Sequence, residues 1–522
     1  MRKTIFAALA LSTLISAPAV AQTGGGAPEP QTTEPIVKRP QGRLVKNQAR
    51  KALSFYSTGA GADVDSVDYY IGDYVVGDDG CVYLKNPFTF YPTQSYLKLD
   101  RLHGDTLVAR MPQAIYQDEA MLYASRLVLK SGSQGMTYGY EQNADGTFNT
   151  DMRFLLRGDT LTLLGEDTSG DYPQAILGLA TLSGNWAETG EATLSVRPLG
   201  VKPTALPQGV TPQLYQLAYS GFYGEGADLV EVAFADGKVY LSNPYNTCGM
   251  QWAVGNVAGN SVAFVPQYLG PNEGEGYHEF LCPGVYSETA KEYFELTDSL
   301  RFVYDDAAKT LSASIPQSLL INVGDDRVYT AAVYIGPSLT PYTATADRPA
   351  NPEITSYAPY GEEGEGEGSL QFELPSVDVN GQPLFKNNLY YKVYTASGKV
   401  LTFGPDQYES IEKEMTEVPY GMSDNVDFFM ADDSHKFYFR EAADSLGLQS
   451  VYKGERELCS DIVWTTGRTS TAIALPATRH EGTGDARYFD LQGRQLSGRR
   501  QGVCIRQRVL TDGRIVNEKT IQ

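Results

Sequence analysis

Apolar and polar residues alternate along most of the chain, which is the pattern of half-buried β-strands. Residues 229–235 alternate in this way, and Asp236-Gly237 then supplies a hairpin turn before the apolar residues resume. Residues 310–315 show the same period of two, and no window of comparable length shows the 3.6-residue period of an amphipathic helix. The pattern therefore predicts an all-β protein.

An internal repeat divides much of this pattern into two copies of one domain. Residues 79–88 (DGCVYLKNPF) recur as residues 236–245 (DGKVYLSNPY). Shorter matches keep the same order and approximate spacing: Pro40-Gln41-Gly42 with Pro207-Gln208-Gly209, Pro112-Gln113 with Pro266-Gln267, and Arg153-Phe154 with Arg301-Phe302. We predict two antiparallel β modules, copy 1 over residues 36–200 and copy 2 over residues 201–342, each a sandwich or an open barrel.

A third module follows the repeat. Residues 352–466 contain further alternating segments, such as the one through Leu370, Phe372 and Leu374. Short strands at this spacing favour an immunoglobulin-like sandwich. Residues 467–484 are polar and predict a linker to a small C-terminal β tail, residues 485–522.

The first residues have the pattern of a secretory signal peptide. Arg2 and Lys3 precede an apolar run, and Ala19-Val20-Ala21 has the small residues of a cleavage site. We predict a signal peptide over residues 1–21 and a flexible Gly- and Pro-rich leader over residues 22–35, with a retained membrane anchor as the alternative. No later stretch has the length of a membrane-spanning helix, so we expect an exported mature chain without membrane insertion.

Charge narrows the choice of partners. The formal net charge of −21, from 42 Lys and Arg against 63 Asp and Glu, leaves no overall basic footprint for nucleic acid or anionic lipid. The tail from Asp485 is the exception, with eight basic residues against four acidic ones. This asymmetry marks the tail as a separate unit.

Several of these phrases resemble those of large secreted proteins of Bacteroidales, in which two related β modules precede a fibronectin type III-like module. The resemblance rests on Val-Tyr-Leu-x-Asn-Pro in both copies and on residues 374–381 (LPSVDVNG) in the third module. Residues 488–494 (YFDLQGR) resemble the C-terminal sorting domains that the type IX secretion system reads, although Cys504 stands where Tyr or Asn is more typical. The resemblance implies export to the cell surface or medium, with the periplasm as second choice, and brings no activity or site residues.

Motifs for catalysis and metal binding are incomplete. His278-Glu279 followed by Cys282 has the first half of a zinc-peptidase motif, but Cys282 stands in place of the second His. The chain has five Cys and no C-x-x-C pair; Cys248 and Cys282 either form a disulfide or remain small buried thiols. We predict no catalytic residue, no metal and no cofactor.

Carboxylates leave one enzymatic alternative open. Four Glu lie within residues 361–368, which favours a flexible acidic loop over a weak cation site. A pair of Asp or Glu brought together by folding could hydrolyse a glycoside, because the two groups need only be near in space. The sequence does not identify such a pair.

Aromatic residues provide the one binding hypothesis. Trp252 stands in copy 2 where Tyr96 falls in copy 1, and Tyr245 corresponds to Phe88. Flat rings of this kind stack on sugars when exposed, and they are core residues when buried. We predict an exported, non-enzymatic binding protein for a glycan or a protein. A polymer hydrolase using an Asp/Glu pair, and a structural surface protein or inhibitor, are the alternatives.

Overall fold

The computed structural model describes the chain over a set of ranges with short gaps between them. The ranges are 27–57, 62–117, 120–132, 135–165, 172–221, 224–245, 251–287, 294–324, 329–361, 367–408, 410–424, 426–441, 443, 445–465, 487–489, 503–509 and 515–521. The chain forms two compact units, residues 1–200 (unit 1) and 201–522 (unit 2), which are treated separately below. The predicted signal peptide and the linker at 467–484 lie outside the described residues.

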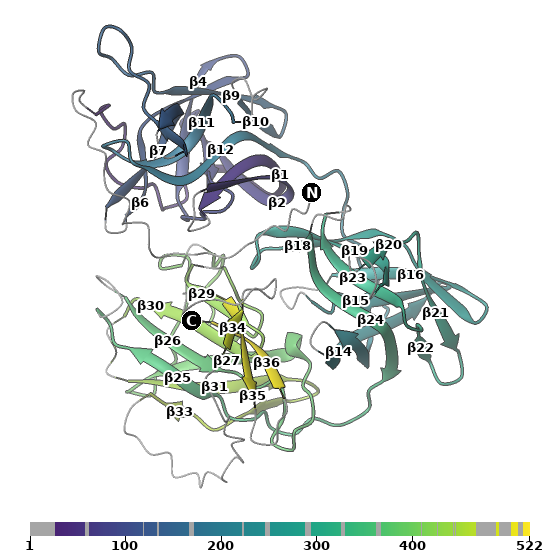
Figure 1. Ribbon diagram of the computed structural model, residues 1–522. Coiled ribbons are helices and arrows are strands. Elements are labelled where there is room, and N and C mark those ends of the chain that lie inside the picture. The colour runs from purple at the N-terminus through teal and green to yellow at the C-terminus, as the bar shows by residue number, and fades with distance from the viewer. Residues whose placement is uncertain are drawn as a thin grey trace. The chain divides into compact units, whose positions relative to one another are not determined.

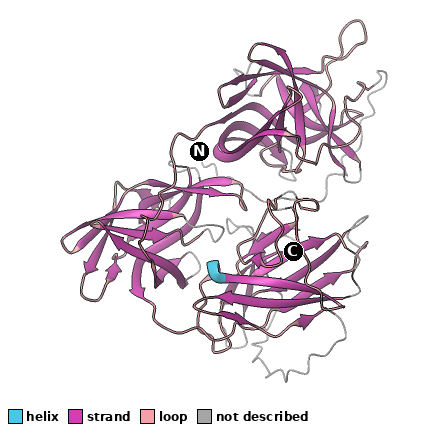
Figure 2. Cartoon of the chain, turned by 180° about the vertical axis from the view of Figure 1, so that it is seen from behind, coloured by secondary structure: helices cyan, strands magenta, loops and turns pink. Residues whose placement is uncertain are grey.

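The prediction of an all-β protein is confirmed. Strands form every described element except one short 3-10 turn, η1 (Lys386–Asn388) (Figures 1 and 2). The hairpin predicted at Asp236-Gly237 is present, with φ of 51° and 70° at the two residues. Positive φ at both central positions is what a tight hairpin turn of type I′ requires, and Asp-Gly adopts it readily.

Twelve strands make up the described part of unit 1. They are β1 (Gly42–Ser57), β2 (Ala62–Gly77), β3 (Val82–Lys85), β4 (Tyr96–His103), β5 (Thr106–Arg110), β6 (Gln113–Gln117), β7 (Met121–Gly132), β8 (Gly135–Gly139), β9 (Asp151–Arg157), β10 (Thr160–Leu164), β11 (Ala175–Thr181) and β12 (Trp186–Arg197). Eight of them close into an antiparallel barrel in the order β1-β2-β3-β4-β5-β9-β10-β12, because β12 pairs back to β1. The other four extend a side sheet from β12 through β11 to β7, which also pairs β6 and β8.

Copy 2 repeats this plan within unit 2. Its strands are β13 (Gln213–Gly221), β14 (Gly224–Ala235), β15 (Lys238–Ser242), β16 (Trp252–Ala258), β17 (Ser261–Phe264), β18 (Gln267–Asn272), β19 (Tyr277–Tyr286), β20 (Phe294–Leu296), β21 (Leu300–Asp305), β22 (Thr310–Ser312), β23 (Gln317–Val323) and β24 (Tyr329–Pro341). Its barrel runs β13-β14-β15-β16-β17-β21-β22-β24 and closes onto β13. Its side sheet joins β24, β23, β19 and β18, with β20 on β19. Both copies are therefore closed barrels, and neither is a sandwich.

The registers of the two copies also agree. Leu107 pairs with Phe154 in copy 1, and Val262 pairs with Phe302 in copy 2. Inside the barrel of copy 2, Phe264 and Phe302 lie edge to face with ring centroids 5.7 Å apart. Burying each such ring stabilises the fold by about 1.5–3 kcal/mol. The alternating apolar positions of these strands therefore account for the closed core.

A second, smaller aromatic cluster lies on the outer face of each barrel, and we call it the outer cluster. Strand alternation turns Tyr83 and Tyr240 away from the barrel interior. The outer cluster of copy 1 comprises Val75, Tyr83, Tyr96, Ile36, Leu44 and Cys81, and that of copy 2 comprises Ala233, Tyr240, Trp252, Leu206, Val210, Ala235 and Val254. The segment before each barrel covers its cluster: Tyr96 N–H donates to Ile36 O at 2.9 Å, and Thr204 bridges Trp252.

The predicted flexible leader at 22–35 is in part an ordered segment. Within it, Gln31 N–H donates to Pro112 O at 2.7 Å, and Thr32 forms a parallel bridge with Gln113 of β6. The Gly- and Pro-rich composition suggested flexibility, but prolines also favour an extended backbone that fits a sheet edge.

The third module of unit 2 consists of two sheets over one core. One sheet has the order β25 (Glu353–Ala358), β26 (Gly368–Glu373), β30 (Ser434–Phe439), β29 (Phe428–Ala431). The other has the order β28 (Val418–Pro419), β27 (Leu389–Thr395), β31 (Leu446–Lys453), β32 (Glu457–Cys459), with β33 (Val463–Trp464) also on β31. Phe372 and Phe437 of the first sheet pack with Tyr391 of the second in the shared core. The tail forms a three-stranded antiparallel sheet of β34 (Arg487–Phe489), β35 (Val503–Val509) and β36 (Ile515–Ile521).

The repeated Pro-Gln pair has the same structural role in both barrels. The Gln113 side chain accepts from Lys98 N–H and donates to Lys98 O and Arg110 O, each at 2.9 Å. Gln267 accepts from Val254 N–H at 2.7 Å and donates to Val254 O and Val265 O, each at 3.0 Å. One amide thus replaces a missing ladder partner for strand β4 or β16, and we call this arrangement the glutamine clasp.

Gln267→Leu is expected to destabilise copy 2 by about 2 kcal/mol, because it leaves one N–H and two carbonyl groups of the backbone without partners. Gln213→Leu, at an exposed position on β13, is the matched control and is expected to change stability by less than about 0.5 kcal/mol. Hydrogen exchange of β16 peptides in the full chain measures both effects. Equal stability of the two variants would contradict the role of the clasp.

Candidate functional site

The aromatic residues predicted to bind a ligand lie in cores. Tyr96, Phe88 and Trp252 are 1%, 1% and 3% exposed. Tyr245 is half-buried and packs against the barrel core of copy 2. Tyr96 and Trp252 do occupy equivalent positions, since each pairs with the last residue of the preceding strand. Their burial favours the core alternative and removes the stacking argument for a glycan.

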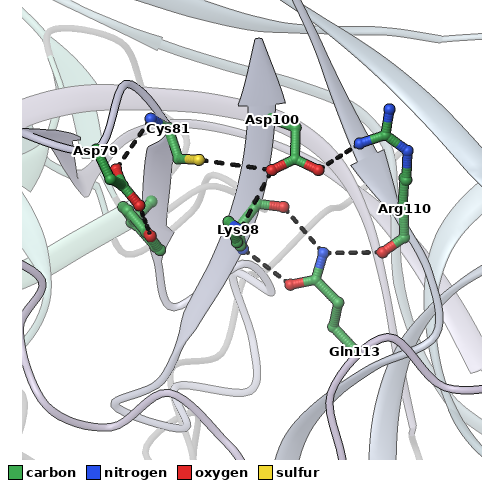
Figure 3. A network of polar contacts seen from close by, with 7 residues as sticks. Asp79, Cys81, Lys98, Asp100, Arg110 and Gln113 are labelled. Atoms are coloured by element: carbon green, nitrogen blue, oxygen red, sulfur yellow. Dashed lines mark hydrogen bonds and ion pairs between the residues drawn. The ribbon is translucent and has the colours of Figure 1, made fainter. Parts of the chain in front are cut away.

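Charged side chains gather beside the outer cluster of copy 1, over its glutamine clasp (Figure 3). Asp100 is the centre: its carboxylate accepts from Arg110 and from the Cys81 thiol at 3.5 Å, and lies 3.3 Å from Lys98 Nζ. Asp79 accepts from the Tyr83 hydroxyl at 2.6 Å and from Cys81 N–H at 3.0 Å. We call these residues the charged network.

Electrostatics keep the two carboxylates of the charged network ionised. Burial alone would raise the pKa of Asp100, but Lys98, Cys81 and Arg110 outweigh it and hold that pKa below its ordinary value. The hydrogen bond from Tyr83, helped by Cys81 N–H, lowers the pKa of Asp79. Both groups are therefore anions near neutral pH, and neither is suited to donate a proton as a general acid.

Cys81 does not have the surroundings of a catalytic thiol. Burial raises the pKa of the Cys81 thiol, and the hydrogen bond to Asp100 raises it further, against the opposing effect of Lys98. Reactive cysteines require the reverse, a lowered pKa in an electropositive environment. Cys81 therefore acts as a small half-buried member of the outer cluster.

Copy 2 keeps the clasp but arranges its charges differently. The clasp of Gln267 and the pairing of β15 with β16 place Val254 at the position of Lys98 and Asn256 at that of Asp100. Val265 corresponds to Arg110 in the same way and is 45% exposed. The positions of Lys98, Asp100 and Arg110 thus carry an ion-pair network in copy 1 and no charge in copy 2, where exposed Lys238 and Asp236 stand at the positions of Cys81 and Asp79.

A buried carboxylate fixes the Asn-Pro turn that follows β3. Glu191 on β12 is 1% exposed; it accepts from the Ser54 hydroxyl and from Thr89 N–H at 2.5 Å. Arg50 is also buried and donates to Asn86 O at 2.7 Å. Burial raises the pKa of Glu191 to about 7, in spite of Arg50 and the two hydrogen bonds. The sequence did not distinguish Glu191 from Glu188, the other Glu of β12, or from a surface acid.

Copy 2 fixes the equivalent turn with a carboxylate from a different strand. Glu279 on β19 is fully buried and accepts from Asn243 at 2.5 Å and from Asn272 at 2.7 Å. Its neighbour His278 is buried and hydrogen-bonded to the Tyr268 hydroxyl at 2.8 Å. The His-Glu pair that resembles half a zinc-peptidase motif therefore lies on a strand and holds a turn, where a zinc peptidase has a helix.

The third module contains a further buried acid that pairs with an arginine. Asp427 is 7% exposed and pairs with Arg440 at 2.7 Å, and Arg440 also contacts Glu367 at 3.2 Å. Burial raises the pKa of Asp427 to about 7, and nearby Asp424 adds to the effect while Arg440 opposes it. Asp424 itself accepts three backbone N–H groups, from Val426 to Phe428, so it shapes a turn.

The described residues bear on the metal prediction and on one of the two cysteines of the disulfide prediction. Within those residues, no group of three His, Cys, Asp or Glu is placed to hold a metal ion. Cys282 is buried, whereas Cys248 lies outside the described residues, so the pairing of the two stays a prediction. Most of the acidic loop, residues 362–366, also lies outside them.

Comparisons with known proteins do not assign a family. No protein-family model matches the chain, and no curated protein matches it. Across the described ranges, the structure contains no helix of the length and apolar character needed to cross a membrane.

The change in the unfolding free energy of unit 1 that Glu191→Gln causes is expected to be more favourable at pH 8 than at pH 5. A carboxyl whose pKa is raised from 4.5 to about 7 by folding supports the fold below pH 4.5 and loses that contribution as pH rises through about 7. The glutamine amide does not ionise, so the difference in unfolding free energy between variant and wild type should shift by about 3 kcal/mol across this window. Hydrogen exchange of unit 1 peptides at several pH values measures it, and a difference independent of pH would contradict the ionisation of Glu191.

Proposed function

We propose that the protein is an exported, non-enzymatic binding protein whose ligand is a protein. The observation that supports this is the contrast between equivalent surfaces of the two copies. The positions of Lys98, Asp100 and Arg110 in copy 1 are occupied by Val254, Asn256 and Val265 in copy 2. A shared scaffold with differently charged surfaces suits two different contacts on a ligand. Protein surfaces, which mix charged and apolar patches, fit this pair better than a glycan does, since Tyr96, Phe88 and Trp252 are buried.

A polymer hydrolase is less well supported. Hydrolysis of a glycoside needs one carboxyl that holds its proton and a second that is ionised, both open to substrate. Glu191 and Asp427 have the raised pKa but are 1% and 7% exposed. Asp79 and Asp100 are more accessible, but their pKa values are lowered.

The third module and the tail fit the same proposal. Two sheets over a common core are compatible with a fibronectin type III-like spacer, and the tail strands with a type IX sorting domain. The protein would then be carried to the cell surface or released, where a protein ligand is available. A purely structural protein or an inhibitor is the remaining alternative.

Binding and turnover are tested together on the same extracellular glycans and proteins, with the purified mature chain immobilised. We expect retention of a protein without turnover. Arg110→Ala should weaken retention by about tenfold or more, because it removes one of the two cations that pair with Asp100. Arg157→Ala, at an exposed arginine of unit 1 outside the network, is the matched control. Turnover would favour the hydrolase, and neither retention nor turnover would favour a structural role.

Export is tested by protease shaving of intact cells that produce either the full chain or a truncation before Asp485. We expect the full chain to be cleaved and the truncated chain to be protected, because the tail would be needed for passage through the outer membrane. Protection of both forms would place the protein in the periplasm and contradict the sorting role of the tail.

A further inference from the structure

The outer edge of β6 in copy 1 is covered by the segment before the barrel. Gln31 N–H donates to Pro112 O at 2.7 Å, and Ala114 N–H donates to the Thr32 hydroxyl at 2.9 Å. Pro112, Gln113 and Ala114 are all buried beneath this segment. Copy 1 thus already holds an extended peptide on its edge strand.

The bound segment has a simple pattern. Its inward residues are Pro28, Pro30 and Thr32, which are buried or half-buried, and the residues between them are exposed. This is the period of two expected of an extended chain, and it gives the pattern Pro-x-Pro-x-Thr. Proline suits the inward positions because its φ is already fixed near the extended range, so less conformational entropy is lost on binding.

Copy 2 has the same edge in the same register. Gln267 corresponds to Gln113 through the clasp, and both edge strands shift register directly afterwards, between Ala114 and Tyr116 and between Tyr268 and Gly270. Tyr268 therefore corresponds to Ala114, and its backbone N–H is directed to the same outer side as that of Ala114.

This edge of copy 2 is uncovered. Pro266 is exposed, and Gln267 and Tyr268 are half-buried, whereas their counterparts in copy 1 are buried. Among the described ranges, no segment forms a bridge to the outer side of residues 266–268. An edge strand with accessible N–H and C=O groups is a template for another strand.

Chain connectivity explains the difference. In copy 1 the covering residue Thr32 precedes Ile36, whose carbonyl binds Tyr96, by four positions. In copy 2 Thr204 bridges the equivalent Trp252, and the residue four positions before it is Gly200, the last of unit 1. The stretch that would cover the edge, residues 196–200, begins inside β12 and is committed to the barrel of copy 1.

We infer that residues 266–268 of copy 2 bind an extended Pro-x-Pro-x-Thr segment of a partner protein, as copy 1 binds its own residues 28–32. This inference rests on the proposed function and specifies how the protein ligand is held. Tyr268 N–H donates to the threonine hydroxyl of the segment, and Pro266 O accepts a backbone N–H. Val265, which is 45% exposed, lies next to this edge and offers apolar contact to a proline ring.

The probe is a synthetic peptide with the sequence of residues 27–35, added to the full chain, in which copy 1 remains covered by its own segment. A short tether corresponds to a millimolar effective concentration, so the peptide is titrated to about 5 mM. We expect hydrogen exchange at the Tyr268 amide to slow by about twofold when the peptide reaches its dissociation constant. Exchange at the Ala114 amide should not change.

A second peptide with Val at the position of Thr32 is the matched control. Loss of the hydroxyl acceptor should weaken binding by about tenfold. No slowing at Tyr268 up to about 5 mM, or equal slowing with both peptides, would overturn the inference. Failure here with Arg110-dependent retention intact would reject the edge site alone, whereas absence of any retained protein would reject the proposed function itself.

Discussion

Each barrel module depends on one strand that belongs to two sheets. The C-terminal half of β12 pairs with β1 and β10 and so closes the barrel, while its N-terminal half pairs with β11 and carries the side sheet. β24 does the same in copy 2. A strand can serve both sheets only if its pairing changes along its length, and the register shift opposite Ala192, between Leu53 and Ser54, provides that change. The barrel closes, and the side sheet is held in place, because of this single strand.

Local patterns were sufficient to predict strands and the repeat, but not the closure of the barrel. Alternation at Leu311 and the turn at Asp236-Gly237 are set by neighbouring residues, so the sequence records them directly. Barrel closure depends on β12 meeting β1, which are more than 100 residues apart, and no local pattern encodes such a contact. The same limit applies to the candidate residues: Tyr96 and Trp252 were recognised as equivalent, yet their burial depends on Ile36 and Leu206, which fold over them from preceding segments.

The polar interior was the least predictable part of the structure. His278 and His435 are both buried, and each is held by a hydrogen bond that sequence spacing does not indicate. Glu191 and Glu279 illustrate the reason: an acidic residue within an apolar strand is compatible with a surface position until the partner groups are known. The repeat predicted the shared apolar core but not the buried carboxylates, because the two copies supply them from different strands.

The buried charges that differ between the two barrels affect how the chain folds. Tandem domains with the same strand order are prone to exchange strands with one another during folding. Register places Leu217 of copy 2 at the position of Arg50, and Tyr334 at the position of Glu191. A hybrid barrel that combined β1 with β24 would bury the Arg50 guanidinium without Glu191, and removing one partner of a buried ion pair costs about 3–5 kcal/mol. The buried charges that differ between the copies therefore disfavour exchange of strands between the two barrels.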